Sequence, residues 1–409
     1  MEGEVTFTAV EVFVALVAAA GVVGLLARRI AVPYTVALVV FGLAAALFAP
    51  DLDFEIAEDL VLVVLLPGLI FEAAYNLDLA ELRRSFGGVT LLAVPGVVVS
   101  ALIVAAVLWA ATDIPFELGF VIGAMVAATD PAAVIATFRR LGSPKRLTTL
   151  VEGESLFNDG TALVVFAIAL QAIRTNVSAA EAVWIFGVTV VVSAGIGIVI
   201  GWAASRLIAT VDDHLLELTV SLAAAYGAYL IADLLHESGI IATVVAGMVL
   251  GNYGRRIGMS ARTQEALDTV WEFVAFLLTA LVFLLVGLVI TFPSLIDALW
   301  PIGVGIAAIL VGRAFVVYVL LGGTSRLISD RIHPAIPLAW LHVMFWSGLR
   351  GGVAVAMALS LPGDLPQRQL LQEVTFGIVL FTLLVQGTTT GLVIRRSGAG
   401  AAQVRDHGS

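Results

Sequence analysis

Apolar runs of about 20 residues recur along this whole chain, and they constrain its fold more than any other feature. Each run is long enough to cross the hydrocarbon core of a bilayer, which is roughly 30 Å thick. The composition agrees, because 60% of the 409 residues are hydrophobic and only 13% are charged, whereas a soluble domain has about 25% charged residues. The sequence therefore predicts an all-α polytopic membrane protein and excludes a soluble globular domain.

A hydropathy window of about 19 residues predicts thirteen membrane spans. They cover residues 7–27, 31–49, 60–76, 88–111, 116–137, 148–173, 181–207, 215–235, 237–253, 266–291, 295–321, 337–361 and 370–394. The thirteen divide into six spans, one linking span and six spans, and the single linking span inverts the second set relative to the first. Two inverted six-helix repeats are typical of secondary transporters. We expect residues 1–396 to form one membrane domain and residues 397–409 to form a short cytoplasmic tail.

The basic residues predict the orientation of these spans. With the N-terminus outside, 17 of the 21 Lys and Arg residues fall in cytoplasmic segments, whereas only Arg174 and Arg368 fall in outer loops and Arg313 and Arg350 fall inside spans. This asymmetry follows the positive-inside rule. We therefore expect a multi-pass protein of a prokaryotic cell membrane with its N-terminus outside and its C-terminus in the cytoplasm.

The composition also excludes several functions. The chain has no cysteine, so it forms no disulfide and uses no thiol chemistry. Its net charge of −10 gives no reason to expect nucleic-acid binding, and we expect no cofactor. The predicted outer loop 49–59 is acidic; we interpret it as a solvated loop, although it would also concentrate cations near an entrance.

The fifth predicted span contains a helix-breaking sequence. Pro131 lacks a backbone N–H and collides with the carbonyl of the preceding turn. Asp130 directly before it can cap a new helix, for which Pro131 is a suitable first residue. We expect two half-helices that meet near Ala128, Thr129 and Asp130, where freed carbonyl oxygens and the Thr129 hydroxyl are available to a cation.

The twelfth span contains a second interruption, because three glycines, Gly348, Gly351 and Gly352, surround Arg350. Both interruptions fall in the fifth span of their set of six, and such pairs of interrupted helices indicate the binding site of a transporter. The ends of half-helices carry about half a unit charge each. We expect Asp130 and Arg350 to neutralise these ends.

The sixth span begins with polar residues in the stretch VEGESLFNDG, residues 151–160. Positions four apart share a helix face, so Ser155 lies over Asp159 and Glu154 lies over Asn158, and the two stripes are adjacent. A carboxylate at membrane depth costs about 2.5–3.5 kcal/mol on insertion scales and usually marks an ion path. Glu152, nearer the helix start, is expected to be an interfacial acid.

Asp159 is the predicted ion and proton site. A hard monovalent cation prefers oxygen ligands, which an ionised carboxylate, a serine hydroxyl and a main-chain carbonyl supply. A proton can occupy the same carboxylate. Competition of the two for Asp159 would give obligatory exchange. Glu72, near the cytoplasmic end of the third span, is either a second group that faces this site or an interfacial acid. Arg313 and His342 are expected to have structural roles.

Six short motifs of this chain resemble the sodium/proton antiporters of the NhaP and NHE type in their order and spacing. They are LLPGLIFEA, ATDP, GESLFNDG, SGIIATVVAG, FVAFLLTALVFLLVG and GLRGGVAVAMALS. The resemblance extends over about residues 10–395. It implies a homodimer of thirteen-helix protomers in the membrane lipid. It also implies a scaffold of helices 1–3 and 8–10, about 7–76 and 215–291, and a moving core of helices 4–6 and 11–13, about 88–173 and 295–394.

The resemblance also implies roles for individual residues. Asp159 binds Na⁺ or H⁺ with oxygens from Ser155 and Thr129, and Glu72 approaches from the scaffold. Asn158 is a structural neighbour, and an Asn-Asp pair marks electroneutral exchange of one univalent cation, Na⁺ or Li⁺, for one proton. The resemblance further implies an ion pair between Glu154 and Arg350. The chain departs from many relatives at Thr279, where they carry asparagine.

Three other functions compete with this interpretation, the last of which is a passive channel. Potassium/proton exchange is the first, because oxygen ligands alone do not set the ion size. The second, more remote, is an intramembrane aspartyl protease, which would need Asp130 and Asp159 on facing helices. The sequence settings of those enzymes are missing here, and Asp130 precedes a proline as a helix cap.

Overall fold

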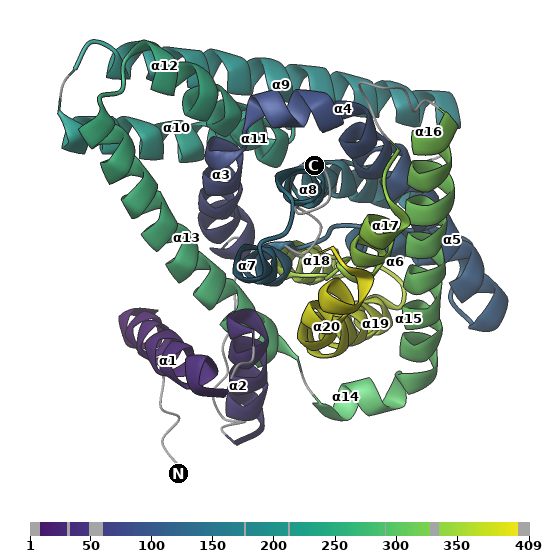
Figure 1. The fold of residues 1–409 in the computed structure, drawn as a ribbon. Helices are drawn as coiled ribbons and strands as arrows, with labels where there is room; N and C mark the ends of the chain where they lie inside the picture. The colour runs from purple at the N-terminus through teal and green to yellow at the C-terminus, as the bar shows by residue number, and fades with distance from the viewer. Residues whose placement is uncertain are drawn as a thin grey trace, which may run out of the picture.

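A computed structural model describes residues 9–30, 33–48, 60–175, 177–211, 213–290, 292–327 and 335–399. Within these ranges the regular structure is entirely helical, and no strand occurs (Figure 1). The prediction of an all-α polytopic chain is confirmed. The acidic loop 49–59 and most of the expected tail, residues 400–409, lie outside the described residues.

The described residues up to the end of the predicted linking span form nine helices and one π-helical segment, η1. They are α1 (Ala9–Ile30), α2 (Tyr34–Phe48), η1 (Leu60–Leu65), α3 (Leu66–Asn76), α4 (Leu79–Ala93), α5 (Pro95–Ala111), α6 (Phe116–Met125), α7 (Ala132–Leu141), α8 (Lys145–Arg174) and α9 (Ala179–Ile208).

The part of the second half that the structure describes contains eleven helices and three further π-helical segments. They are α10 (His214–Leu234), α11 (Gly239–Val249), η2 (Leu250–Gly254), α12 (Arg255–Ile257), α13 (Ala261–Val289), α14 (Phe292–Asp297), α15 (Leu299–Ala314), η3 (Phe315–Leu321), α16 (Gly322–Leu327), α17 (Leu338–Trp346), α18 (Gly352–Leu359), α19 (Arg368–Phe381), η4 (Thr382–Gln386) and α20 (Gly387–Ser397).

Seven helical stretches of the described residues are long and apolar enough to cross a membrane on their own. They are Leu79–Ala111, Lys145–Arg174, Ala179–Ile208, His214–Leu234, Ala261–Val289, Leu299–Leu327 and Arg368–Ser397. The other predicted spans coincide with shorter apolar helices or with the two interrupted ones.

The helix of the fourth predicted span begins earlier than the sequence predicted, at Leu79 instead of residue 88. Asp78 caps it, because its side chain accepts hydrogen bonds from the backbone N–H groups of Ala80 and Glu81 at 2.8 and 3.2 Å. Its first turns carry Glu81 and two arginines, which lower the mean hydropathy without opposing helix formation. A hydropathy window therefore misses this charged start, whereas the cap predicts it.

The two interrupted helices lie near the centre of the molecule, where the labels of α7 and α18 are close together in Figure 1. Helix α18 contacts α6, α8 and α13, so the second interruption packs against the first and against the polar helix α8. Helix α9 instead lies at the periphery and exposes a row of apolar side chains: Val183, Trp184, Val191, Ile198, Val199 and Trp202. Exposure of such a face is expected for a helix in contact with lipid.

Helix α6 is placed by its close packing on α5. A Cβ atom on Gly123 would lie 2.5 Å from the carbonyl oxygen and 2.7 Å from the Cα atom of Ala101, so only glycine allows this approach. Small residues at such crossings are the usual means by which membrane helices approach each other. Gly123 thus fixes the half-helix that ends just before the first interruption.

We predict that Gly123→Ala destabilises the protein, because the atoms it would meet belong to the backbone of α5 and cannot rotate away. Overpacking of this kind costs about 1–3 kcal/mol. The apparent melting temperature in detergent should fall. Gly187→Ala on α9 is the matched control, since a Cβ there meets nothing within 4 Å, and it should leave the melting temperature unchanged or raise it, as alanine favours helix by up to about 1 kcal/mol. Equal melting temperatures for the two variants would contradict the packing argument.

Candidate functional site

The predicted interruption of the fifth span is present. Helix α6 ends at Met125, and α7 begins at Ala132. Asp130 caps the second half-helix, because its Oδ1 accepts a hydrogen bond from the Ala132 N–H at 2.9 Å. Residues 128–130 between the two halves are not helical. The carbonyls of Ala128 and Thr129 accept from the side chains of Arg350 and Ser155 instead, as expected from the proline.

The twelfth span is interrupted as well, between Trp346 of α17 and Gly352 of α18. Each of its three glycines leaves room for a different neighbour. A Cβ on Gly348 would lie 3.0 Å from Arg313 Nε, one on Gly351 would lie 2.9 Å from Asp130 Cγ, and one on Gly352 would overlap Val282 of α13. The glycines therefore permit close packing from three directions at this interruption.

The two interruptions are joined directly. The backbone N–H of Asp130 donates to the carbonyl of Leu349 at 2.8 Å. The Asp130 side chain lies against Gly351, at the start of α18, as well as at the start of α7. One carboxylate thus lies at the N-termini of both second half-helices, where the helix dipole is positive.

Arg350 lies at the opposite kind of helix end. Its Nη1 donates to the carbonyls of Ala127 and Ala128 at 3.1 and 3.4 Å, directly after α6. Its backbone N–H is held by Thr382 Oγ1 at 3.0 Å. These carbonyls lack helical partners and form the negative end of α6, and Arg350 supplies a donor and a positive charge there. The predicted neutralisation by Asp130 and Arg350 agrees with this geometry.

The expected ion pair between Glu154 and Arg350 is wrong. Both oxygens of the Glu154 carboxylate accept from the guanidinium of Arg313 on α15, from Nη1 and from Nη2, the latter at 3.0 Å. Arg350 instead donates through its Nη1 to the main chain of the first interruption. Within the described residues Glu154 forms no other ion pair.

Arg313 also neutralises the end of α17. Its Nε and Nη2 donate to the carbonyl of Met344 at 3.2 and 2.8 Å. Arg313 is 7% exposed and Glu154 is 2% exposed, and a buried ion pair is stable only when additional hydrogen bonds satisfy it. The Met344 carbonyl provides these. Arg313, which the sequence predicted either to pair with a core acid or to snorkel, pairs with Glu154 and is the counterpart of Arg350 at the second interruption.

The two polar stripes of α8 face different surroundings. Ser155 and Asp159 line a cavity of about 1220 Å³. Glu154 and Asn158 instead line a small hollow of about 10 Å³ together with Arg313 and Arg350. The sequence predicted one continuous polar patch, but the structure separates a cavity-facing stripe from a stripe that holds the core together.

Asp159 lies halfway along the 30-residue helix α8. Its Oδ1 is buried and has no hydrogen-bond partner among the described residues. Ser155, one turn earlier on the same face, donates through its hydroxyl to the carbonyl of Thr129. The Ser155 side chain, the Thr129 carbonyl and Asp159 all border the cavity, as does Asp130. The structure thus gathers the oxygen groups that the sequence predicted as cation ligands.

Asn158 makes two contacts with the first interruption. Its Nδ2 donates to Thr129 Oγ1 at 2.8 Å, and its Oδ1 accepts from the Thr129 N–H at 3.3 Å. Both ends of the amide are therefore occupied, and the side chain is 2% exposed. This geometry suits a structural neighbour that holds Thr129 in place, and it leaves the cavity to Asp159.

The cavity extends from Asp159 towards one end of α8. Its lining on this helix runs from Thr148 to Asp159, about 16 Å at 1.5 Å per residue. Glu72, Glu152 and the exposed Arg139 also line it. Of the two interpretations of Glu72, the structure favours a group that faces the cavity, and Glu152, expected to be interfacial, lines it too.

Other residues of the cavity were weaker signals in the sequence. Glu272 and Thr279 line it from α13, and Thr279 is the position where many relatives have asparagine. His342 is exposed, and its Nδ1 lies 2.7 Å from the Tyr318 hydroxyl, so it is not a core residue. Within the described ranges no group of three or more His, Asp or Glu side chains is placed to hold a metal ion.

Comparisons with known proteins identify the family of this chain. Residues 12–396 match the family described as "Sodium/hydrogen exchanger, transmembrane". The chain is 42% identical over 371 residues to the low-affinity Na⁺/H⁺ antiporter NhaS1 of Synechocystis, with 89% of this chain and 69% of the relative covered. It is 40% identical over 375 residues to the Na⁺/H⁺ antiporter ApNhaP of Aphanothece halophytica, with 90% and 70% covered.

A solved structure has a similar fold. The sodium proton antiporter MjNhaP1 of Methanocaldococcus jannaschii superimposes with a TM-score of 0.75 over 95% of this chain and 98% of that chain. The sequence identity is 19%, so this similarity concerns the fold alone.

The pairing of Glu154 with Arg313, and not with Arg350, can be tested by a double-mutant cycle. Arg313→Met should destabilise the protein by about 3–5 kcal/mol, because it leaves a buried carboxylate without its counter-charge. Glu154→Gln should be coupled to it by about 0.5–3 kcal/mol. The coupling is measured from the stabilities of the two single variants and the double variant in detergent.

The same cycle with Arg350→Met is the matched control. It should show a smaller coupling to Glu154→Gln, since Arg350 donates to main-chain carbonyls instead. A larger coupling of Glu154 to Arg350 than to Arg313 would contradict the pairing.

Proposed function

We propose a function from the premise that this chain belongs to the transmembrane sodium/hydrogen exchanger family, since the family match covers residues 12–396 and curated relatives are up to 42% identical. It is a secondary active antiporter and not an enzyme. It exchanges one Na⁺, or one Li⁺, for one H⁺ across a prokaryotic cell membrane, and it uses no cofactor.

The buried Oδ1 of Asp159 carries this proposal. It has no hydrogen-bond partner among the described residues and lies at the inner end of a cavity. A buried oxygen without a partner costs about 1–3 kcal/mol, more when it is charged. Either a cation or a proton on the carboxylate removes this cost. Asp159 with Ser155 and the Thr129 carbonyl binds Na⁺, and a proton on Asp159 displaces it.

Exchange follows if only an occupied site moves across the membrane. The site residues lie on α8 and on the first interruption, which is hydrogen-bonded to the second at Asp130 and Leu349. We assign these elements to a moving core, which comprises the predicted spans 4–6 and 11–13. The predicted spans 1–3 and 8–10, which form α1–α3 and α10–α13 in the structure, are assigned to a scaffold that presents Glu72. Movement of the core relative to the scaffold gives alternating access to the two sides.

The finer architecture belongs to the same proposal. We propose thirteen spans in two inverted repeats, because every predicted span coincides with one helix or a run of consecutive helices and the two interruptions occupy equivalent places. We propose an outer N-terminus and a cytoplasmic C-terminus from the distribution of basic residues. The cavity then opens to the cytoplasm, since the exposed Arg139 and Arg140 line it. The protein acts as a homodimer in the lipid.

The exchange is electroneutral. Asp159 is the carboxylate that meets the cation, and it can release one proton for each Na⁺ that it binds. Its neighbour Asn158 adds no charge and holds Thr129 instead. Asp130 lies at two helix N-termini and neutralises them, so it is not the carboxylate that exchanges the proton. Neither the family nor the named relatives support potassium/proton exchange or proteolysis.

We predict that Asp159→Asn abolishes exchange. In liposomes with an imposed pH gradient, added Na⁺ should dissipate the gradient with the wild-type protein and not with the variant. The asparagine keeps the size of the side chain but neither releases a proton nor offers a charge. The apparent KM of the wild type for Na⁺ should rise about tenfold per pH unit at low pH, where protons compete for the same carboxylate.

The exposed Asp113→Asn is the matched control, because it makes the same chemical change away from the cavity; it should exchange normally. Separate addition of Na⁺, Li⁺ and K⁺ tests selectivity. Retained exchange in Asp159→Asn, or a KM that does not depend on pH, would overturn the mechanism.

Electroneutrality has its own measurement. A net charge that crosses a potential of about 100 mV changes its free energy by about 2.3 kcal/mol. We therefore expect the same Na⁺-driven rate whether a potassium ionophore sets the potential at zero or at about 100 mV of either sign. A rate that changes severalfold with the potential would show net charge movement and contradict the one-for-one stoichiometry.

A further inference from the structure

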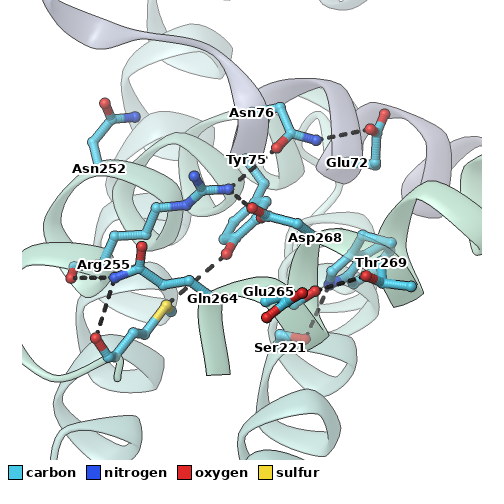
Figure 2. Close-up of polar contacts among 12 residues, drawn as sticks. Glu72, Tyr75, Asn76, Ser221, Asn252, Arg255, Gln264, Glu265, Asp268 and Thr269 are labelled. Carbon is cyan, nitrogen blue, oxygen red and sulfur yellow. Dashed lines mark hydrogen bonds and ion pairs between the residues drawn. The ribbon is translucent and has the colours of Figure 1, made fainter. Parts of the chain in front are cut away.

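The Glu72 carboxylate is held by a side chain of its own helix. Asn76, one turn later on α3, donates from Nδ2 to Glu72 Oε1 at 2.8 Å (Figure 2). The other end of this amide, Oδ1, accepts from Arg255 Nη2 at 3.2 Å. An amide has one donor end and one acceptor end. Arg255 therefore determines that the donor end of Asn76 faces Glu72.

Arg255 is itself fixed from two further sides. Its Nη2 lies 2.5 Å from Oδ1 of Asp268 on α13, and its guanidinium lies 4.3 Å from the centre of the Tyr75 ring. The ion pair is partly exposed, with side-chain exposures of 28% and 46%, so its energy alone is modest. Its contribution is geometric, because a planar guanidinium on an aromatic ring with a carboxylate partner has little freedom to rotate.

The backbones that carry this chain of contacts are also fixed. A Cβ on Gly247 of α11 would lie 2.9 Å from the Phe71 carbonyl oxygen, and one on Gly251 would overlap the Tyr75 carbonyl oxygen. Asn252 accepts from the Leu79 N–H and donates to the Leu77 carbonyl, each at 3.1 Å. The end of α3 is therefore anchored to α11 and η2, and the contacts run within the proposed scaffold.

We propose that Asn76 and Arg255 are positioning residues for the ion path: the chain Asp268–Arg255–Asn76 holds one oxygen of Glu72 and leaves the other for a cation on its way to Asp159. This inference rests on the proposed function. Neither Arg255 nor Asp268 lines the cavity, so both act through Asn76. Preorganisation of a ligand group raises affinity because less side-chain freedom is lost on binding.

The test is a comparison of KM and maximal rate for Na⁺ in liposomes. Asn76→Ala and Arg255→Gln should each raise the KM for Na⁺, by up to about tenfold, the equivalent of one hydrogen bond to a charged group. The maximal rate should stay within about twofold, because Asp159 and the core are unchanged. Arg256→Gln, the adjacent exposed arginine, makes the same charge change at the same surface and should leave both parameters unchanged.

Two further variants separate positioning from a structural effect. The double variant Asn76→Ala/Arg255→Gln should have the same KM as Asn76→Ala alone, because Arg255 acts through the amide. Arg255→Lys retains a cation that can donate to Asn76 Oδ1, and it should recover part of the affinity even if Arg255→Gln is poorly folded. Additive effects on KM, or equal effects in Arg255→Gln and Arg256→Gln, would overturn the positioning role.

The two proposals can fail separately. Exchange that survives Asp159→Asn overturns the proposed function. If Asp159 is required and Glu72→Gln raises the KM, but the Asn76 and Arg255 variants behave as wild type, only the positioning role is overturned. If Glu72→Gln leaves the KM unchanged, the positioning role is overturned and the role of Asp159 in exchange is unaffected.

Discussion

The structure depends on the neutralisation of four helix ends that meet inside an apolar protein. Each end carries about half a unit charge together with unpaired N–H or C=O groups, and the membrane offers no water to satisfy them. Two arginines neutralise the two C-terminal ends, where carbonyl groups are unpaired: Arg350 does so at α6 and Arg313 at α17. One acid, Asp130, neutralises the two N-terminal ends, those of α7 and α18. Without these side chains neither interruption would be stable, and no main-chain oxygen would be available at the centre.

This arrangement leaves the remaining acids of α8 with separate tasks. Glu154 balances Arg313 on the side of the small hollow. Asp159 lies on the cavity side with a buried oxygen that no described group satisfies. The protein therefore satisfies the charges that maintain its shape and leaves unsatisfied the carboxylate of Asp159, to which we assign the exchange. In a helix of 3.6 residues per turn, a shift of one position in sequence is enough to separate these two environments.

The features that depend on local chemistry could be predicted from the sequence. Pro131 and the glycines around Arg350 predicted both interruptions, and the depth of Asp159 in an apolar span predicted its place in the site. The partner of Glu154 could not be predicted in this way. Arg313 is 159 residues away in sequence, and only the tertiary packing of α15, mainly against α5 and α19, decides which arginine reaches the acid. An arginine within an apolar span does signal a buried partner, but it does not say which one.

The contact between Asn76 and Arg255 shows the same limit. Asn76 and Glu72 are four residues apart on one helix, so their hydrogen bond follows from the spacing. Arg255 is 179 residues further along the chain, and its loop position suggested only a cytoplasmic charge. The start of α4 was missed for a different reason, since a hydropathy window discounts charged turns that Asp78 nonetheless caps.

The hydrogen bonds from Arg350 to the first interruption have a consequence for how the chain is made. Arg350 and Ala127 are separated by 223 residues. At a synthesis rate of about 5–20 residues per second, Arg350 is synthesised roughly 10 to 45 seconds after the carbonyl groups that follow α6. During that interval water or the insertion machinery must satisfy these carbonyls. Biogenesis, and not only transport, therefore places a demand on the order in which the two halves are inserted.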